Sequence, residues 1–166
     1  MARPHDGVYR LESVFDEAQC AALIAWSEAE GLAPRGGPDE APAFARCAEP
    51  ERLPAFVWPR LTAALGAAGL RLAGAPRIAV IDRFDAGQRL LPAVAGGEGP
   101  DGLAVVVPLN DGCAGGEAVC YPAAGPQLVV LRAGAGMAFP AVLTYEELPV
   151  RTGPKYVLRA VVACQP

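Results

Sequence analysis

The first third of the chain carries apolar residues at the spacing of an amphipathic helix. Residues 8–14 predict a short entry strand, and Asp16 stands where an N-cap would start a helix. Cys20 and Leu23 recur on one face of that helix, and Gly31 ends it. We therefore predict one strand followed by one helix in this region.

A loop and a second helix are expected next. Residues 33–43 are rich in Pro and Gly, which is typical of a loop. Apolar positions at helical spacing predict a helix from about residue 53 to residue 68. Pro59 within this run favours a kink or a later start of the helix.

From residue 77 onward the pattern changes to short β-rich runs separated by Gly and Pro. The predicted strands are residues 77–84, 102–109, 116–121, 127–132, 136–140 and 155–164. Two helices followed by many short strands predict an α+β fold, with the N-terminal helices packed on a β-sandwich. The chain shows no internal repeat, so we expect residues 1–166 to form a single domain.

Composition narrows the classes of partner. The chain is 52% hydrophobic and has a net charge of −4, with no cluster of Lys and Arg, which argues against nucleic-acid binding. No apolar run reaches the roughly 18 residues of a membrane span. The N-terminus lacks the apolar stretch of a signal peptide, so we expect a cytoplasmic protein. The sequence is compatible with a homodimer as well as with a monomer.

The five cysteines are an odd number and include no CxxC pair. In a cytoplasmic chain this pattern favours reduced, mostly buried thiols. Cys113 and Cys120 lie close enough in sequence to face each other across a turn, so a redox or nucleophilic role is the minor alternative.

Two motifs resemble those of the prolyl-4-hydroxylase-like Fe(II)/2-oxoglutarate dioxygenases. Residues 84–95 resemble the strand that carries a His-x-Asp pair of iron ligands, but here the pair reads Ala93 and Ala95. Residues 145–159 resemble the last motif of the family, in which a His opens the stretch and a later Lys holds the far carboxylate of 2-oxoglutarate. Tyr145 stands at the position of the His, and Lys155 at that of the Lys.

The resemblance extends over nearly the whole chain. Residues 108–110 and 115–117 match the Tyr-Leu-Asn and Gly-Gly-Glu-Thr stretches of the family. The resemblance implies that the sandwich is a double-stranded β-helix, which is a form of jelly roll.

The same resemblance implies that the iron site has been lost. Two imidazoles and one carboxylate hold one face of Fe(II) and leave the other face open. Two methyl groups and a phenol cannot do this, and His5 is the only histidine in the chain. We therefore expect no metal and no bound cofactor, with 2-oxoglutarate or another small carboxylate as a candidate ligand.

Four polar residues are candidates for binding an anion. Lys155 and Arg159 are separated by four residues on a predicted strand, so both should point to one face. The resemblance implies that this face lines the barrel interior; the alternative is a pair of exposed cations at a sheet edge. Arg89 and Asn110 are expected at the barrel mouth by resemblance, although an exposed Arg89 is the simpler interpretation.

Three residues are candidates for acid–base chemistry. Tyr145 either acts as a proton donor or acceptor, or fills the space left by the metal. Glu98 and Asp101 lie in a glycine-rich loop beyond the lost His-x-Asp site, where acidic residues are most often solvated turn formers. We expect Glu146 and Glu147 to be surface charges.

The sequence leaves three functions open. The first is a pseudo-oxygenase that binds a small anionic molecule or a peptide in its barrel. The second is a metal-independent enzyme of the cyclase, isomerase or lyase type, as in natural-product biosynthesis, and the third is an oxygenase with atypical metal ligands. A perturbed acid–base pair near Lys155 would favour the enzyme, whereas a pocket filled by its own side chains would favour a scaffold.

Overall fold

The computed structural model describes residues 7–34, 41–47, 50–74, 78–95 and 102–165. The elements of the first half are β1 (Tyr9–Leu11), α1 (Glu17–Glu30), β2 (Ala33–Pro34), β3 (Ala43–Cys47), the 3₁₀-helix η1 (Pro50–Arg52), α2 (Val57–Ala67), β4 (Ile78–Phe84) and β5 (Leu90–Val94). Those of the second half are β6 (Gly102–Pro108), β7 (Ala114–Gly115), β8 (Ala118–Cys120), β9 (Gln127–Val129), β10 (Gly136–Pro140), β11 (Thr144–Glu147), β12 (Val150–Thr152) and β13 (Lys155–Ala163).

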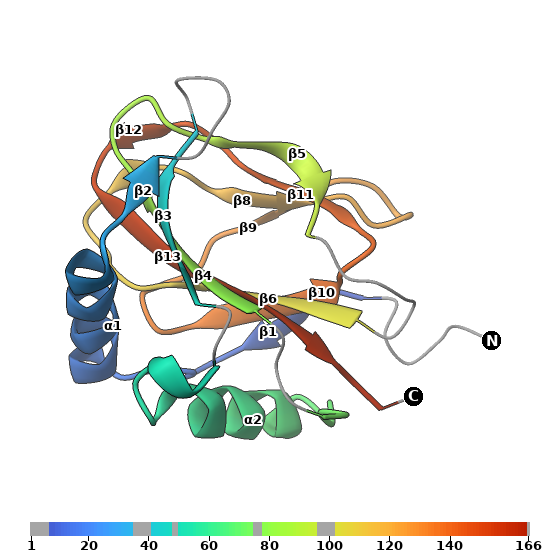
Figure 1. Cartoon of the computed structure of the whole chain (residues 1–166). Helices are drawn as coiled ribbons and strands as arrows, with labels where there is room; N and C mark the ends of the chain where they lie inside the picture. Colours follow the sequence, from blue (N-terminus) through green and yellow to red (C-terminus); the bar gives the residue numbers. More distant parts are fainter. Residues whose placement is uncertain (1–6, 35–40, 48–49, 75–77, 96–101, 166) are drawn as a thin grey trace.

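The strands form a large and a small antiparallel sheet, which are stacked as two layers (Figure 1). The seven-stranded sheet has the order β1-β10-β6-β13-β4-β3-β2, and the four-stranded sheet has the order β5-β11-β8-β9. A two-stranded sheet of β12 and β7 lies beside them. The fold is mostly β, with two helices, and it is consistent with the predicted jelly roll.

Both predicted helices are present. Asp16 caps α1 because its side chain accepts a hydrogen bond from the Gln19 amide at 2.8 Å, while the Gln19 side chain accepts one from the Asp16 amide. Gly31 follows the helix with φ +89°, which glycine adopts without strain. The second helix starts later than residue 53, at Val57, and this places Pro59 in its first turn, where Pro is tolerated.

Each face of the seven-stranded sheet contributes to a separate apolar cluster. On β13, Leu158 and Ala160 belong to the cluster that also contains residues of both helices, whereas Val157 and Val161 belong to the cluster between the two sheets. Side chains alternate along a strand, so Lys155 and Arg159 share the inner face with Val157. Lys155 and Arg159 therefore lie on one face of β13, as predicted, and this face is turned toward the space between the two sheets.

Several strand predictions were wrong or incomplete. The predicted loop at 33–43 contains β2 and the first residue of β3, because Ala33 and Pro34 pair with Phe44 and Ala43. The entry strand covers only three of the seven predicted residues. Strands β7, β11 and β12 were absent from the predicted set, because they have only two to four residues and form through pairing with sequence-distant neighbours. Strand β5 was indicated only by the resemblance of residues 84–95 to the strand of the family.

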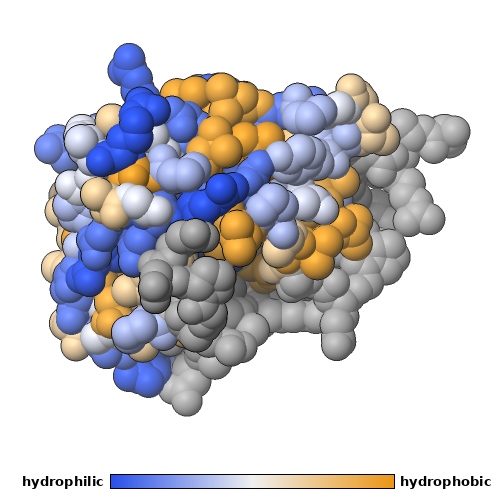
Figure 2. Space-filling model, turned by 90° about the horizontal axis from the view of Figure 1, so that it is seen from above, coloured by the Kyte–Doolittle hydropathy of each residue, from blue (hydrophilic) through white to orange (hydrophobic). Residues whose placement is uncertain are grey.

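Exposed apolar side chains occur on and beside the strands β5 and β9 of the small sheet. Figure 2 looks onto this side and shows hydrophobic patches divided by a hydrophilic stripe. Among the described residues, the exposed large apolar side chains are Leu91, Val94, Leu128, Val130 and Val142. No helix within the described residues is long and apolar enough to cross a membrane.

Candidate functional site

The ladder between β5 and β11 brings together two of the positions that resemble iron ligands. Tyr145 pairs directly with Ala93, and directly paired residues place their side chains on the same face of a sheet. Ala95 lies two residues further along the chain and is half-buried. Ala93 and Tyr145 are thus neighbours across the ladder, although Ala93 is exposed and Tyr145 is buried. The three positions supply two methyl groups and a phenol, which do not fit Fe(II).

The described residues offer no other set of metal ligands. No group of three His, Cys, Asp or Glu residues there could hold a metal ion. Glu98 and Asp101, two of the candidates for acid–base chemistry, lie outside the described residues, as does His5.

Tyr145 is one of the largest fully buried side chains. Its ring packs against Phe139 with the ring centroids 5.4 Å apart, and its hydroxyl group has no hydrogen-bond partner among the described residues. Burial, and then the charge of Glu147, raise the pKa of Tyr145 well above its usual value. The phenol therefore stays protonated, and it is not part of the cavity wall described next.

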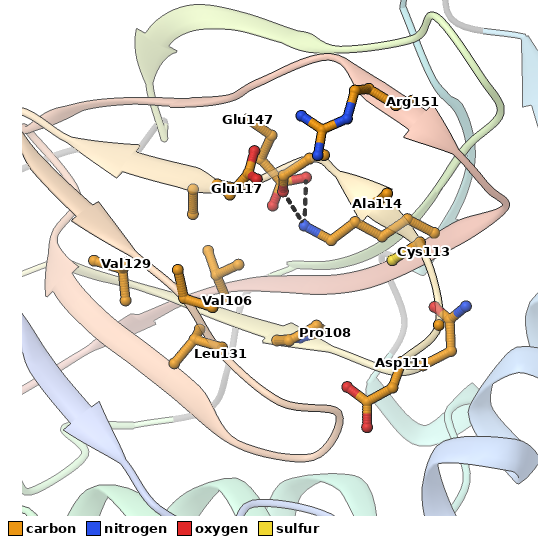
Figure 3. Close-up of a pocket in the computed structure, with 17 residues that line it drawn as sticks. Val106, Pro108, Asp111, Cys113, Ala114, Glu117, Val129, Leu131, Glu147 and Arg151 are labelled. Carbon is orange, nitrogen blue, oxygen red and sulfur yellow. Dashed lines mark hydrogen bonds and ion pairs between the residues drawn. The ribbon is translucent and has the colours of Figure 1, made fainter.

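A cavity of about 340 Å³ opens between the sheets, near the ends of β6 and β13. Its wall has two chemically different sides (Figure 3). Glu117, Glu147 and Arg151 lie on one side, and the apolar side includes Val106 and Leu131. A ligand with one polar end and a short apolar body would match this division.

Lys155, the only lysine in the chain, lines this cavity. Its side chain is 11% exposed, its Nζ donates a hydrogen bond to the Gly116 carbonyl oxygen, and it lies 3.8 Å from Glu147 Oε2. The anionic group nearest to the Lys155 ammonium is therefore the carboxylate of Glu147, which belongs to the protein itself.

The backbone of β7 and the residue after it shapes the space around this lysine. Gly115 and Gly116 have φ of +76° and +73°. A Cβ atom at Gly116 would lie 3.0 Å from Lys155 Cδ and 2.9 Å from Val150 Cγ2, and one at Gly115 would clash with the Pro149 carbonyl oxygen. Glycine is required at both positions by conformation and by contact.

Glu147 contradicts the prediction that it is a surface charge. It is 1% exposed, lines the cavity, and neither carboxylate oxygen accepts a hydrogen bond from a described residue. Burial raises the pKa of Glu147 to about 7, with Asp82 adding to the rise and Lys155 and Arg159 opposing it. The sequence signal was available: Glu147 follows Tyr145 by two residues, so both face inward on β11.

Arg159 pairs with a buried acidic residue that the sequence pattern did not indicate. Its Nε lies 2.5 Å from Oδ2 of Asp82, a fully buried residue of β4. Asp82 lies on the inner face because it pairs directly with Val157. Arg159 is not among the described cavity-lining residues, and its charge is balanced by Asp82.

The other two candidate anion-binding residues have different surroundings. Asn110 lines the cavity, but its side chain donates to the Pro154 carbonyl oxygen and accepts from the Tyr156 amide, both at 2.8 Å, so it fixes the start of β13. Arg89 donates to Glu146 at 2.9 Å, and Tyr121 donates to the same carboxylate. Glu146 is thus also buried, contrary to prediction, but this group is not part of the described cavity wall.

Comparison with known proteins gives the fold. No family model and no curated protein matches the chain. A 2-oxoglutarate/Fe(II) oxygenase-family oxidoreductase from Burkholderia pseudomallei matches with a TM-score of 0.72 and 20% identity, over 95% of this chain and 84% of that one. The collagen prolyl hydroxylase of Paramecium bursaria Chlorella virus-1 matches with a TM-score of 0.73 and 15% identity, over 98% and 100%.

A third similar structure is the α-ketoglutarate-dependent epimerase SnoN from nogalamycin biosynthesis, with a TM-score of 0.73 and 16% identity over 95% of this chain and 78% of that one. The chain therefore has the fold of the Fe(II)/2-oxoglutarate oxygenases. Within that class, its fold is of the prolyl-4-hydroxylase-like kind.

Proposed function

We propose that this protein uses the oxygenase fold without iron, and that it binds a small anionic ligand in the cavity through Lys155. The observation that carries the proposal is the position of this lysine: the ammonium is nearly buried, lines a cavity of about 340 Å³, and is held by a single carbonyl oxygen and a carboxylate at 3.8 Å. An ammonium group can donate three hydrogen bonds, so Lys155 retains capacity for a ligand.

The absence of iron in this proposal rests on the residues themselves. Ala93 and Tyr145 are paired on adjacent strands where the resemblance places two iron ligands, and neither side chain is a good donor to Fe(II). We therefore propose a pseudo-oxygenase.

The shape of the cavity favours a small acid with a short aliphatic body, or the carboxylate end of a peptide. Its apolar side would cover the aliphatic part, and Arg151 adds a second cation on the polar side. Small-molecule sites commonly combine an apolar wall with a few placed polar groups.

The second candidate is a metal-independent enzyme, and the Glu147 carboxyl favours it. Its pKa of about 7 suits proton transfer near neutral pH, and it lies beside a cation that would stabilise a developing anion. Glu147 replaces Tyr145 as the acid–base candidate, since the phenol does not line the cavity. Reactions of the isomerase, lyase or cyclase type would need no oxidant.

Calorimetric titration in the presence of a chelator tests the binding proposal. Five-carbon diacids (glutarate, 2-oxoglutarate and 2-hydroxyglutarate) are suitable probes. Lys155→Met should weaken binding by roughly tenfold or more, because a hydrogen bond to a charged group is lost. Arg52→Met is the matched control, since it removes a surface cation that pairs with Glu30 and does not line the cavity. Equal binding by wild type and Lys155→Met would reject the proposal.

The enzyme candidate has a separate readout. In deuterated water, wild-type protein should exchange the hydrogen next to the carboxylate of a bound acid faster than Glu147→Gln does, as followed by proton NMR. If the acid binds but its hydrogen does not exchange, the ligand-binding function is retained. The acid–base role of Glu147 is then rejected for these probes.

A further inference from the structure

The two carboxylate oxygens of Glu147 are the least satisfied polar atoms at the cavity. Both are buried, and neither accepts a hydrogen bond from the described residues, although the Lys155 ammonium lies 3.8 Å from Oε2. Leaving a buried acceptor without a donor is costly, and the cost is larger for a charged group. A ligand that brings a donor to this point would remove that cost.

The groups around Glu147 do not supply this donor. Lys155 donates to the Gly116 carbonyl oxygen, and Arg159 donates to Asp82 from the same inner face. The Tyr145 hydroxyl is buried and has no hydrogen-bond partner of its own. Burial is the main cause of the raised pKa of Glu147, and the Lys155 ammonium opposes this rise without cancelling it.

Resting on the proposed function, we propose that the cavity selects acids that carry a hydrogen-bond donor next to the carboxylate, such as hydroxy acids and amino acids. The ligand carboxylate accepts from Lys155, and its hydroxyl or ammonium donates to Glu147. Groups on neighbouring carbon atoms can reach both partners, because Lys155 Nζ and Glu147 Oε2 are 3.8 Å apart.

The same geometry disfavours two related classes of acid. A plain diacid has no donor for Glu147, and a keto acid presents only acceptors to it. In both, the ligand carboxylate would lie near the Glu147 carboxylate without the hydrogen bond that offsets this repulsion for a hydroxy acid. Sites built to pair a particular polar group reject analogues that lack it far more strongly than apolar pockets reject a missing methylene.

Three acids with one carbon skeleton, one of them used as both enantiomers, test this inference. Glutarate, 2-oxoglutarate and both enantiomers of 2-hydroxyglutarate are titrated calorimetrically into the full chain at about pH 8, above the pKa of Glu147 of about 7. One enantiomer of the hydroxy acid should bind about tenfold or more tightly than glutarate and 2-oxoglutarate. Near-equal affinities of the three acids would overturn the inference.

Glu147→Gln identifies the group responsible. Its amide can donate as well as accept, so the preference for the hydroxy acid should fall to within about threefold. Glu146→Gln is the matched control on the outer face of the same strand, and it should retain the preference. A preference that persists in Glu147→Gln would also overturn the inference.

Failure of the inference is distinguishable from failure of the proposed function. If all three acids bind equally and all lose affinity in Lys155→Met, the anion site stands and only the selectivity is rejected. If no probe binds the folded wild-type protein, both are rejected. The wild-type comparison needs no variant, so the test survives a variant that fails to fold.

Discussion

The burial of Glu147 makes the stability of the protein depend on pH. A carboxyl group at 1% exposure with an unsatisfied pair of oxygens is stabilised in its protonated form, which raises its pKa to about 7 from 4.5. Because the folded state binds this proton more tightly than the unfolded state does, the contribution of Glu147 to stability is fully present below about pH 4.5. It is lost as the pH rises to about 7.

This linkage predicts the behaviour of Glu147→Gln. The amide does not titrate, so the stability of the variant relative to wild type should rise by about 2 to 3 kcal/mol between pH 5 and pH 8. Urea unfolding at the two pH values measures the difference. A relative stability that stays constant, or falls with pH, would show that the carboxyl group is not held in a low-dielectric site.

At the scale of elements, the backbone between β7 and β8 holds Lys155 in place. Gly116→Ala puts a methyl group at φ +73°, with contacts of 2.9 Å to Val150 and 3.0 Å to Lys155. We expect a loss of about 1 to 3 kcal/mol in unfolding free energy. Binding of 2-hydroxyglutarate should also weaken by roughly tenfold or more, because the ammonium is displaced from its partners.

Gly66→Ala is the control for that variant. Gly66 lies within α2, has no atom within 4 Å of an added Cβ and does not have a positive φ. The substitution should stabilise the protein slightly through helix propensity and leave binding unchanged. If Gly116→Ala behaves like this control in both assays, the glycine has no part in shaping the site.

The ladder between β13 and β4 contains a buried ion pair, which is formed by Arg159 and Asp82. Arg159→Met leaves the buried Asp82 carboxylate without its guanidinium partner at 2.5 Å, and it should destabilise the protein by about 3 to 5 kcal/mol. Arg159→Met combined with Asp82→Leu removes both charges and should recover much of this loss. The double variant should still bind the probe acid, whereas loss of binding would assign Arg159 to the ligand site.

How far the sequence predicts these elements depends on their length and pattern. The capped helix α1 and the nine-residue strand β13 were predictable because propensity, alternation and capping agree along them. Strands such as β7 and β12 have two or three residues and form only by pairing across the fold. Their existence depends on tertiary context, which local periodicity does not encode.

The site was predicted only in part for a related reason. The inward direction of Lys155 follows from strand alternation together with the family resemblance. Glu147 was interpreted as solvated because charged residues are rarely buried without a partner. Its burial is the kind of local conflict that is expected at a functional site rather than in a neutral core.

At the scale of the whole molecule, the fold pairs two of the positions that resemble iron ligands across one ladder. The direct pairing of Ala93 with Tyr145 predicts that ligands placed there would converge. The triple variant Ala93→His, Ala95→Asp, Tyr145→His should take up one Fe(II) or Co(II) in anaerobic calorimetry, whereas the wild-type protein should not.

The controls for this rescue are the three double variants, each of which lacks one ligand and should bind more weakly than the triple variant. A folded triple variant without metal affinity would show that the backbone departs from the family's geometry at this point. Stoichiometric Fe(II) uptake by the wild-type protein would instead revive the interpretation as an oxygenase with atypical ligands.

The central claim is that the sole lysine of the chain anchors an acid inside the fold without iron. Selective carbon-13 labelling of lysine gives one side-chain signal, because Lys155 is the only residue of its type. In the presence of a chelator, we expect this signal to shift and saturate as 2-hydroxyglutarate is added, with the same affinity as calorimetry reports. A signal that stays in place while the acid binds, or that shifts only after Fe(II) is supplied, would contradict the account.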